Sequence, residues 1–294
     1  MPELPDIAVY LDCLAPRILG QPLERLAVRN PFVLRSVSPS PAELAGAKVT
    51  RIRRLGKRIV LGLEQERFIV IHLMIAGRLR WLASGAKPPG KITLAVFEFP
   101  TGILALTEAG TTRRASIHLL AGEAALEPFQ RGGLEVLECD RTDFAERLVS
   151  ESHTLKRALT DPRLFSGIGN AYSDEILHRA RLSPLTLTRK LGEDEIARLF
   201  DATRATLLEW TARLRAEAGS GFPEKVTAFR EGMSVHGRYR QPCPDCGTPI
   251  QRIRYADNET NYCARCQTGG RLLADRAMSR ILREDWPRSI DELE

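Results

Sequence analysis

The fold of the C-terminal part of this chain is decided by two short stretches, Pro242-Cys243-Pro244-Asp245-Cys246-Gly247 and Tyr262-Cys263-Ala264-Arg265-Cys266-Gln267, with sixteen residues between Cys246 and Cys263. Two Cys-x-x-Cys motifs at this spacing indicate one structural Zn²⁺ held by four thiolates, with no coordination position left for a substrate. Residues 247–249 predict a turn and residues 250–255 a strand, so the metal would hold a β-hairpin. The alternative is a chance pair of motifs that binds no metal.

Basic side chains and a tail surround this hairpin. Arg252, Arg254 and Arg265 lie on or beside it, where they could contact an anionic partner. Residues 268–294 follow and predict an amphipathic helix, whose apolar positions are Leu272, Leu273, Met278, Ile281 and Leu282. A zinc hairpin with such a tail would serve equally well as a module that binds other proteins.

A glycine-rich turn lies upstream, within residues 141–218, where apolar side chains recur at helical spacing. The stretch Leu164-Phe165-Ser166-Gly167-Ile168-Gly169-Asn170-Ala171-Tyr172 places two glycines before a helix that should begin near Asn170. A tight helix–turn–helix there would present backbone N–H groups and a helix N-terminus, which can bind phosphate. Most such turns only let two helices pack closely, so this motif alone does not identify a binding site.

The first 125 residues predict mostly strands. After a helix predicted over residues 6–19, short segments rich in Val, Ile, Leu and Phe recur over residues 57–63, 68–73, 92–99 and 103–107. Their regular spacing indicates a β-sandwich or barrel. We therefore expect an α+β chain with an N-terminal catalytic domain (1–125), a linker (126–140), a helical domain (141–235), a zinc finger (236–267) and a tail (268–294).

The charge balance points weakly toward an anionic partner such as nucleic acid. The net charge is +6 and the pI is about 9.1. The run Arg51-Ile52-Arg53-Arg54-Leu55-Gly56-Lys57-Arg58 is more informative, because it contains five cations and no acid. A solvated loop explains this run equally well, so the run alone does not define a binding surface.

The sequence predicts a cytoplasmic protein. Residues 2–6 lack the basic start and apolar run of a secretory signal. The longest apolar stretch, near residues 68–77, is interrupted by His72 and is too short to span a bilayer. Paired cysteines of metal type favour a reducing compartment, and Cys13 and Cys139 are expected to be buried structural thiols. The histidines show no ligand spacing, and His72 is best explained as a core residue.

The N-terminal stretch Met1-Pro2-Glu3-Leu4-Pro5-Asp6 offers a candidate nucleophile. Removal of Met1 would leave Pro2 as a secondary amine, and the pKa of a free α-amine, about 7.7–8, leaves a useful neutral fraction. The N-terminus of the following helix would disfavour protonation further. Such an amine can attack an electrophilic carbon and form an iminium ion, with Glu3 as general acid or base. Judged alone, Pro2 is better explained as part of a disordered end.

Taken together, residues 2–267 resemble the formamidopyrimidine-DNA glycosylase / endonuclease VIII family of base-excision repair enzymes. The resemblance implies a β-sandwich, a helix–two-turn–helix domain with a zinc finger, and a monomer associated with the nucleoid. Its partner would be damaged DNA, whose target nucleotide is flipped out of the stack. The matching segments are Pro2-Glu3-Leu4-Pro5-Asp6, Gly56-Lys57-Arg58, His72-Leu73, Gly167-Ile168-Gly169-Asn170-Ala171-Tyr172-Ser173-Asp174-Glu175-Ile176-Leu177, Val235-His236-Gly237-Arg238 and the two cysteine motifs.

The resemblance also implies roles for individual residues. Pro2 would attack C1′ of the sugar and displace the damaged base, while Glu3 would assist ring opening and proton transfer. The Schiff base would then cut the strand by β- and δ-elimination. Lys57, Lys156 and Asn170 would contact the DNA backbone near the lesion, and Lys57 would also count with Pro2 and Glu3 among the catalytic residues. The leading hypothesis is therefore a bifunctional DNA glycosylase and AP lyase.

Several positions depart from the family pattern. Asp6 stands where Glu is common, and the gap left by the flipped base would be filled by Met74, Ile75 or Arg114. Residues 111–115 lack the usual wedge aromatic. Asn258 stands where the zinc finger often has a phosphate-binding Arg, a role that Arg254 or Arg265 could take. Because residues 219–233 are also few for a loop that caps 8-oxoguanine, we favour oxidised pyrimidines, ring-opened bases or hydantoins as substrates.

Two other functions stay open. The altered residues also fit a damage-binding protein of the same fold that does not cut DNA. The zinc finger also fits a module that recruits protein partners through the tail. Binding to DNA should weaken steeply with salt, because neutralising phosphates releases counterions.

Overall fold

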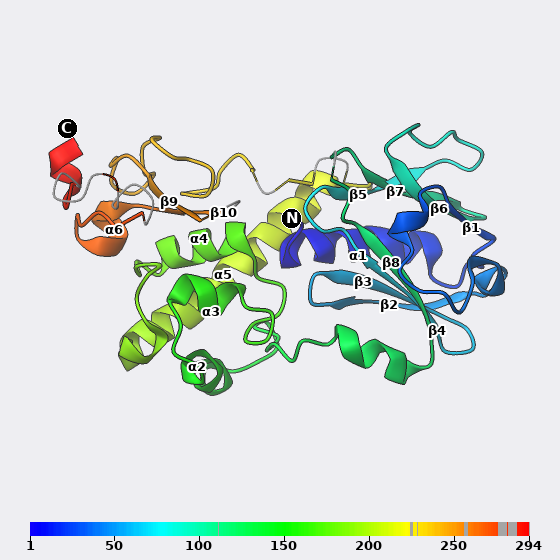
Figure 1. Cartoon of the computed structure of the whole chain (residues 1–294), viewed down its shortest axis with the longest axis horizontal. Helices are drawn as coiled ribbons and strands as arrows, with labels where there is room; N and C mark the ends of the chain where they lie inside the picture. The colour runs from blue at the N-terminus through cyan, green and yellow to red at the C-terminus, as the bar shows by residue number, and fades with distance from the viewer. Residues whose placement is uncertain are drawn as a thin grey trace. The chain divides into compact units, whose positions relative to one another are not determined.

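The computed structural model describes residues 1–110, 112–223, 226–227, 229–255, 258–275, 281 and 287–293. They form two compact units (Figure 1). Unit 1 comprises residues 1–131 and 210–227, and unit 2 comprises residues 132–209 and 228–294. Unit 1 contains both four-stranded sheets, and unit 2 contains a two-stranded hairpin with several helices. The α+β class predicted from the sequence is confirmed.

Unit 1 begins with α1 (Leu4–Ile18), two residues earlier than the helix predicted over residues 6–19. Its first turn is closed by Asp6, whose Oδ2 accepts the backbone N–H of Glu3 at 2.8 Å. This contact satisfies a donor that has no partner within a helix. Ile7, Tyr10 and Leu14 recur along one buried face at helical spacing, so the helix is held by burial of that face.

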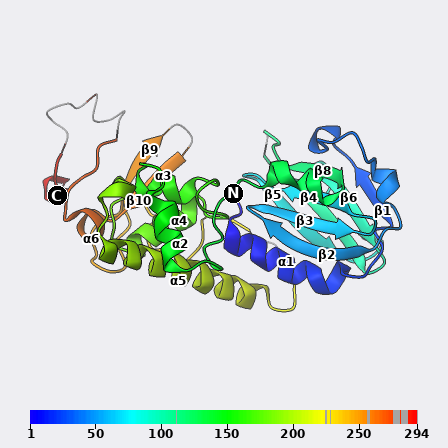
Figure 2. The same cartoon turned by 90° about the horizontal axis from the view of Figure 1, so that it is seen from below.

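Two antiparallel four-stranded sheets follow, and both lie in unit 1 (Figure 2). The predicted strands over residues 57–63, 68–73, 92–99 and 103–107 correspond to β3, β4, β6 and β7. In spatial order, one sheet consists of β1 (Arg25–Val28), β6 (Thr93–Phe99), β7 (Gly102–Glu108) and β5 (Gly77–Leu82), and the other of β2 (Val49–Leu55), β3 (Arg58–Leu63), β4 (Arg67–His72) and β8 (Ser116–Ala121).

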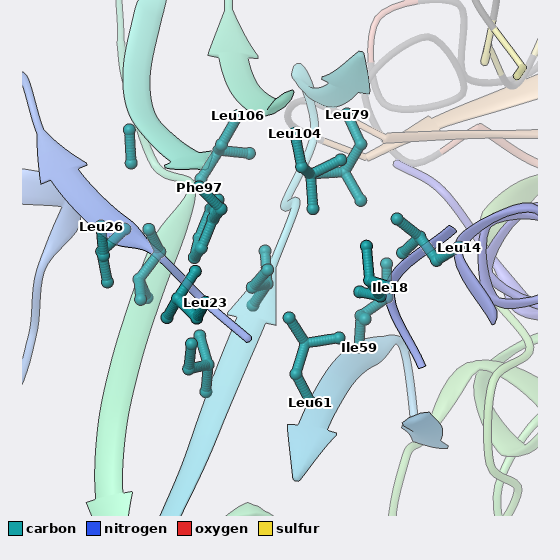
Figure 3. Packing of buried hydrophobic residues seen from close by; sticks show 14 of the residues in the cluster. Leu14, Ile18, Leu23, Leu26, Ile59, Leu61, Leu79, Phe97, Leu104 and Leu106 are labelled. Carbon is teal, nitrogen blue, oxygen red and sulfur yellow. The ribbon is translucent and has the colours of Figure 1, made fainter. Parts of the chain in front are cut away.

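The inner faces of the two sheets and α1 share one apolar core. Figure 3 shows side chains from all three parts of this core: Leu14 and Ile18 from α1, Ile59 and Leu61 from β3, and Leu79, Phe97, Leu104 and Leu106 from β5, β6 and β7. All of these side chains are fully buried. Burial of one such side chain contributes about 1.5–3 kcal/mol, so this core gives unit 1 a rigid base.

The basic run from Arg51 to Arg58 is a hairpin and not a solvated loop. β2 and β3 pair across a tight turn at Gly56 and Lys57, where Gly56 has a φ of +61°. Arg51 and Arg53 both form ion pairs with Glu123, at the start of the short helix η3 (Glu123–Phe129). Two cations of the run therefore share one carboxylate within the fold, whereas Lys57 lies at the turn.

Unit 2 is mainly helical, as the apolar periodicity of residues 141–218 predicted. Phe144 of α2 packs against Phe165 and Phe200, with ring centroids 4.8 and 5.4 Å away. The helix α5 begins in unit 2, and its residues from Trp210 onward are grouped with unit 1. The helices are α2 (Arg141–Val149), α3 (Leu155–Thr160), α4 (Asn170–Arg179), α5 (Glu193–Ala218) and α6 (Ala264–Thr268), and the hairpin strands are β9 (Gln251–Tyr255) and β10 (Asn258–Tyr262).

The start of the tail differs from the prediction. Leu272 and Leu273 are not helical but buried in an extended segment, where they pack with Ile253 and Tyr262 of the hairpin. The Leu273 N–H donates to the Tyr262 hydroxyl at 2.8 Å. Met278 and Leu282, which were expected to continue a helix, lie outside the described residues. A short helical turn, η6 (Ile290–Leu293), comes near the end.

None of the helices in the described ranges is both long and apolar enough to cross a bilayer.

Candidate functional site

The N-terminal end of α1 holds two of the three predicted catalytic residues, Pro2 and Glu3, together. Pro2 and Glu3 are both buried, and Glu3 retains only 2% of its exposed area. Burial lowers the pKa of the terminal amine of Met1 below its usual value of 8.0. Glu3 opposes this shift, while the cations of Arg78 and Lys57 reinforce it. An amine at this end of the chain is therefore shifted toward its neutral, nucleophilic form.

A tight turn next to this end presents two of the predicted void-filling residues. The Gly77 N–H donates to Leu73 O at 2.9 Å, and a Cβ on Gly77 would lie 2.3 Å from that oxygen, so only glycine fits. Arg78 Nη1 donates to the carbonyl oxygens of Ile75 and Gly77 at 3.1 and 2.7 Å. Ile75 is 56% exposed at this turn, and Met74 has a φ of +52°. Arg78 therefore braces a turn that exposes an apolar side chain.

A second set of hydrogen bonds stabilises the segment that carries Arg114. Glu108 is 1% exposed at the end of β7, and its Oε2 accepts the backbone N–H groups of Arg114 and Ala115, both at 3.0 Å. The Arg114 side chain remains exposed. Sequence reasoning missed Glu108. An acid at the end of a mostly apolar strand indicates that its carboxylate has buried hydrogen-bond donors nearby.

His72 and Lys57 lie at neighbouring ends of the β2–β3–β4 sheet. His72 is half-buried and pairs with Arg58 of the neighbouring strand β3. Burial lowers the pKa of His72 to about 4, and the nearby cations of Arg58 and Lys57 lower it as well. The imidazole is consequently neutral at physiological pH.

In unit 2, the α3–α4 turn brings Lys156 and Asn170 together. Asn170 is the first residue of α4, and its Nδ2 donates to Glu259 O of β10 at 2.9 Å. Lys156 Nζ donates to Asn170 O at 2.7 Å and to Asp174 Oδ1 at 2.5 Å. The side chain of Lys156 is 12% exposed and that of Asp174 is fully buried. The lysine charge is therefore compensated within the protein.

Two consecutive acids of α4 organise the segment before the zinc finger. Asp174 Oδ2 accepts from His236 Nδ1 at 2.8 Å and from Asn261 Nδ2 at 3.4 Å. Glu175 accepts the backbone N–H groups of Ser234, Val235 and His236 at 2.7–2.9 Å. Sequence reasoning assigned these acids no role. Their place in the sequence could have indicated a role. A buried helix face rarely carries two carboxylates unless their hydrogen-bond partners are also buried.

The two arginines proposed as substitutes for the position of Asn258 lie on different elements. Arg254 lies on β9 with a side chain that is 63% exposed, and its Nε is 3.9 Å from Glu259. Arg265 lies on α6 and forms an ion pair with Asp291. Asn258 begins β10, so its backbone belongs to that strand.

The four cysteines form a cluster with the chemistry of a metal site. Their Sγ atoms all lie within 4.8 Å of one another, with 3.9 Å between Cys243 and Cys266 and 3.4 Å between Cys246 and Cys263. A tetrahedron with Zn–S bonds of about 2.3 Å requires sulfur–sulfur distances of about 3.8 Å. Burial raises the pKa of the Cys263 thiol to about 12, so a cation is needed to compensate the thiolate charge. The donor set fits a structural metal ion.

Comparison with known proteins places this arrangement in a family. Residues 1–114 match the formamidopyrimidine-DNA glycosylase N-terminal domain, residues 133–217 match the H2TH domain of that enzyme, and residues 240–269 match the zinc finger found in FPG and IleRS. A formamidopyrimidine-DNA glycosylase of Heliobacterium modesticaldum is 34% identical over 282 residues, which cover 91% of this chain and 100% of the relative. The chain belongs to the formamidopyrimidine-DNA glycosylase family.

Solved structures agree with this assignment. The MutM (Fpg) protein from Thermus thermophilus is 31% identical with a TM-score of 0.75, covering 90% of this chain and 98% of that one. Wild-type Lactococcus lactis Fpg, in a complex with DNA containing an oxidized pyrimidine, is 26% identical with a TM-score of 0.78, covering 91% and 100% of the two chains. These likenesses confirm the β-sandwich, helix–two-turn–helix and zinc-finger fold.

Proposed function

We propose that this protein is a DNA glycosylase and AP lyase that removes oxidised bases from DNA. The observation that carries the proposal is the N-terminal end of α1, where Pro2 and Glu3 are adjacent in the chain and both buried. Membership in the family supports the substrate class. The named activity of the Heliobacterium relative and the DNA bound to the Lactococcus protein support it as well.

The proposed chemistry begins after Met1 has been removed. The Pro2 nitrogen attacks C1′, and the bond between C1′ and the base breaks, so that the base leaves with its electron pair and takes up a proton. The nitrogen then loses its proton, and the bond between C1′ and O4′ breaks as O4′ takes up a proton, which opens the sugar and leaves an iminium ion. This cation acts as an electron sink, which allows loss of the 3′ phosphate and then the 5′ phosphate by β- and δ-elimination. Glu3 moves the protons that ring opening and elimination require. Lys57 holds the phosphate beside the reacting sugar.

The remaining predicted residues bind and deform the DNA in this proposal. Asn170, Arg254 and Arg265 contact the backbone, where charge neutralisation supplies most of the affinity. Lys156, which sequence reasoning placed at a phosphate, is proposed to act by holding the carbonyl of Asn170.

The flipped nucleotide leaves a gap in the duplex that Ile75, Met74 or Arg114 would fill. Ile75 supports this part of the proposal because it is 56% exposed on a braced turn. Oxidised pyrimidines, ring-opened bases and hydantoins are the proposed lesions.

The four-cysteine cluster is proposed to hold one structural Zn²⁺, with Cys243, Cys246, Cys263 and Cys266 as ligands. Zn²⁺ suits four sulfur donors at these separations and leaves no site for substrate. We further propose a monomer that acts in the cytoplasm on the nucleoid.

The function is tested by incubating the purified protein, with Met1 removal verified by mass, with duplexes that carry an abasic site, 8-oxoguanine, a dihydropyrimidine or a hydantoin. Base release, strand cleavage and a borohydride-trapped adduct are expected, and the relative rates rank the lesions. Protein that retains Met1 is the matched control, because its amine lies one residue further out. Absence of any adduct, even with the abasic site, would contradict the lyase.

A second candidate is a damage-binding protein of the same fold that does not cut DNA. The observation that favours it is the sequence of residues 112–115, which offers no aromatic side chain to wedge into the duplex. The same assay separates the two functions. Tight binding to a lesion duplex with no base release and no adduct would favour the binder.

A further inference from the structure

We propose that His178 of α4 is an outer partner of the metal site that donates a hydrogen bond to the metal-bound sulfur of Cys243. This inference rests on the proposed zinc site and adds a residue from outside the finger to it. Sequence reasoning assigned His178 no role, because it lies 65 residues before Cys243 and outside the cysteine motifs.

The contact is direct and enclosed. His178 Nε2 lies 3.3 Å from Cys243 Sγ. The side chain of His178 is 4% exposed, and Cys243 is 3% exposed. A thiolate on a metal has no proton to give, so the ring nitrogen must carry the hydrogen. The other candidate acceptor, Asp245 Oδ2, is 4.0 Å away on a side chain that is 44% exposed. The thiolate is therefore the acceptor.

The charge of the site explains why such a donor is useful. Four thiolates around Zn²⁺ carry a net charge of about −2, and burying that charge is costly unless hydrogen-bond donors face the sulfurs. The Cys263 sulfur accepts the backbone N–H of Cys266 at 3.5 Å, a long contact. Cys243 is among the buried ligands, and the imidazole of His178 is its donor. Hydrogen bonds of this kind typically change metal affinity 10–100-fold.

The contact also makes α4 part of the metal site. The same helix reaches Glu259 O through Asn170, and it reaches His236 and Asn261 through Asp174. His178 extends this set of contacts to a metal ligand. Loss of its donor is therefore expected to weaken metal binding while leaving the other contacts of the helix in place.

The test compares His178→Phe, which keeps the ring volume without the donor, with His178→Gln, which keeps an N–H donor. His153→Gln is the matched control, since His153 is half-buried in unit 2 and bonds to Glu151 rather than to a thiol. Zinc affinity is measured by chelator competition, and the sulfur-to-metal charge-transfer bands are recorded after Co²⁺ substitution. We expect His178→Phe to lose roughly 10–100-fold in affinity and to shift the bands. His178→Gln should lose less, and His153→Gln should match the wild type.

Wild-type affinity and unshifted bands in His178→Phe would overturn the inference. If that variant does not fold, the hydrogen bond can be tested by NMR of wild-type protein loaded with ¹¹³Cd. A coupling between the metal and the Nε2 hydrogen of His178 is expected, and a His178 ring protonated only at Nδ1 would overturn the proposal. Failure of the wild-type protein to bind zinc or cobalt through the cysteines would instead defeat the proposed metal site itself.

Discussion

The two units support their candidate sites in different ways. In unit 1, the N-terminal end of α1 rests on a large apolar core that includes Tyr10, Ile59 and Phe97, all fully buried. In unit 2, the β9–β10 hairpin has a small apolar cluster around Ile253 and Tyr262, beside the four cysteines. A two-stranded hairpin is marginal on its own, so metal and polar contacts must supply the stability that apolar burial supplies in unit 1.

The two units also differ in the hydrogen bonds that buried acids make to stabilise the candidate sites. In unit 1, Asp6 and Glu108 bind backbone donors three to seven residues away in the sequence. In unit 2, Asp174 and Glu175 bind donors that are 59–87 residues away, apart from the lysine of α3. Hydrogen bonds between residues close in sequence form together with the turn that they stabilise. Hydrogen bonds between residues far apart in sequence form only when the whole unit is folded. The candidate site of unit 2 should therefore be the more easily disrupted.

The largest expected effect is that of metal removal. Chelation, or the substitution Cys263→Ser, should disrupt unit 2 and abolish tight DNA binding while unit 1 stays folded. In isolated zinc-finger peptides, the metal contributes roughly 10 kcal/mol or more. Limited proteolysis with mass mapping would locate the opened segments. Full DNA affinity without metal, or unfolding of unit 1 together with unit 2, would contradict the proposal that only unit 2 depends on the metal.

Glu3→Gln should separate chemistry from binding. The amide keeps the shape of the side chain but cannot act as general base or acid, so base excision should fall by roughly 10²–10⁴-fold. The N–H of residue 3 still reaches Asp6, so thermal stability and DNA affinity should stay close to wild type. Asp12→Asn is the control, since Asp12 is an acid of the same helix that pairs with Arg215. Equal activity loss in both variants would argue against a specific role for Glu3.

Glu108→Ala should destabilise unit 1, because it leaves the N–H groups of Arg114 and Ala115 without their buried acceptor. An unsatisfied buried donor costs about 1–3 kcal/mol, which should lower the melting temperature by several degrees. Glu108→Gln retains a carbonyl acceptor and should lose much less. Differential scanning calorimetry checks both variants. An alanine variant as stable as the glutamine variant would show that the hydrogen bonds to Glu108 do not stabilise unit 1.

Lys156→Met tests how the lysine serves DNA binding. A phosphate contact would lower the slope of log affinity against log salt by about 0.9, whereas a lysine that holds Asn170 lowers affinity and leaves the slope unchanged. We expect the second result, because the charge of Lys156 is compensated by Asp174. Arg157→Met, which removes an exposed cation from the same helix, is the control. A reduced slope in Lys156→Met would restore the direct contact predicted from the sequence.

The smallest expected effect is a shift in the pH profile. Because burial and nearby cations lower the pKa of an amine at this end of the chain, the rate of adduct formation should rise with pH, with a midpoint below that of an ordinary α-amine. Arg78 is one of the cations that lower this pKa. Arg78→Gln should therefore raise the pKa and move the profile toward higher pH. A shift toward lower pH would contradict the sign of this interaction.

Much of the fold could be predicted because its signals are local. Apolar periodicity predicted α1, β3, β4, β6 and β7 to within a few residues, and cysteine spacing predicted the cluster. β2 was obscured by its arginines, because Arg51 and Arg53 are accommodated in a strand by Glu123, about 70 residues away. Leu272 and Leu273 have helical spacing but lie extended, because the hairpin offers them an apolar surface. In both cases, tertiary contacts overrode local propensity.

The candidate site was predictable only in part, for the same reason. Pro2, Glu3 and the cysteines stand in short motifs, so the sequence suggests them directly as candidates. Asp174 and His178 gain their roles from partners that are 62 and 65 residues away, and a single sequence does not show such pairs. Residues that hold other residues in place are therefore harder to predict than the residues that they hold.

We propose that the chemistry takes place on the N-terminal amine of unit 1. The most direct measurement is borohydride trapping on an abasic duplex, followed by proteolysis and mass spectrometry to locate the modified residue. The account predicts one adduct, on the peptide that begins with Pro2, and its loss in protein that retains Met1. An adduct on Lys57 or another lysine, or no adduct under conditions where the strand is cleaved, would contradict the account.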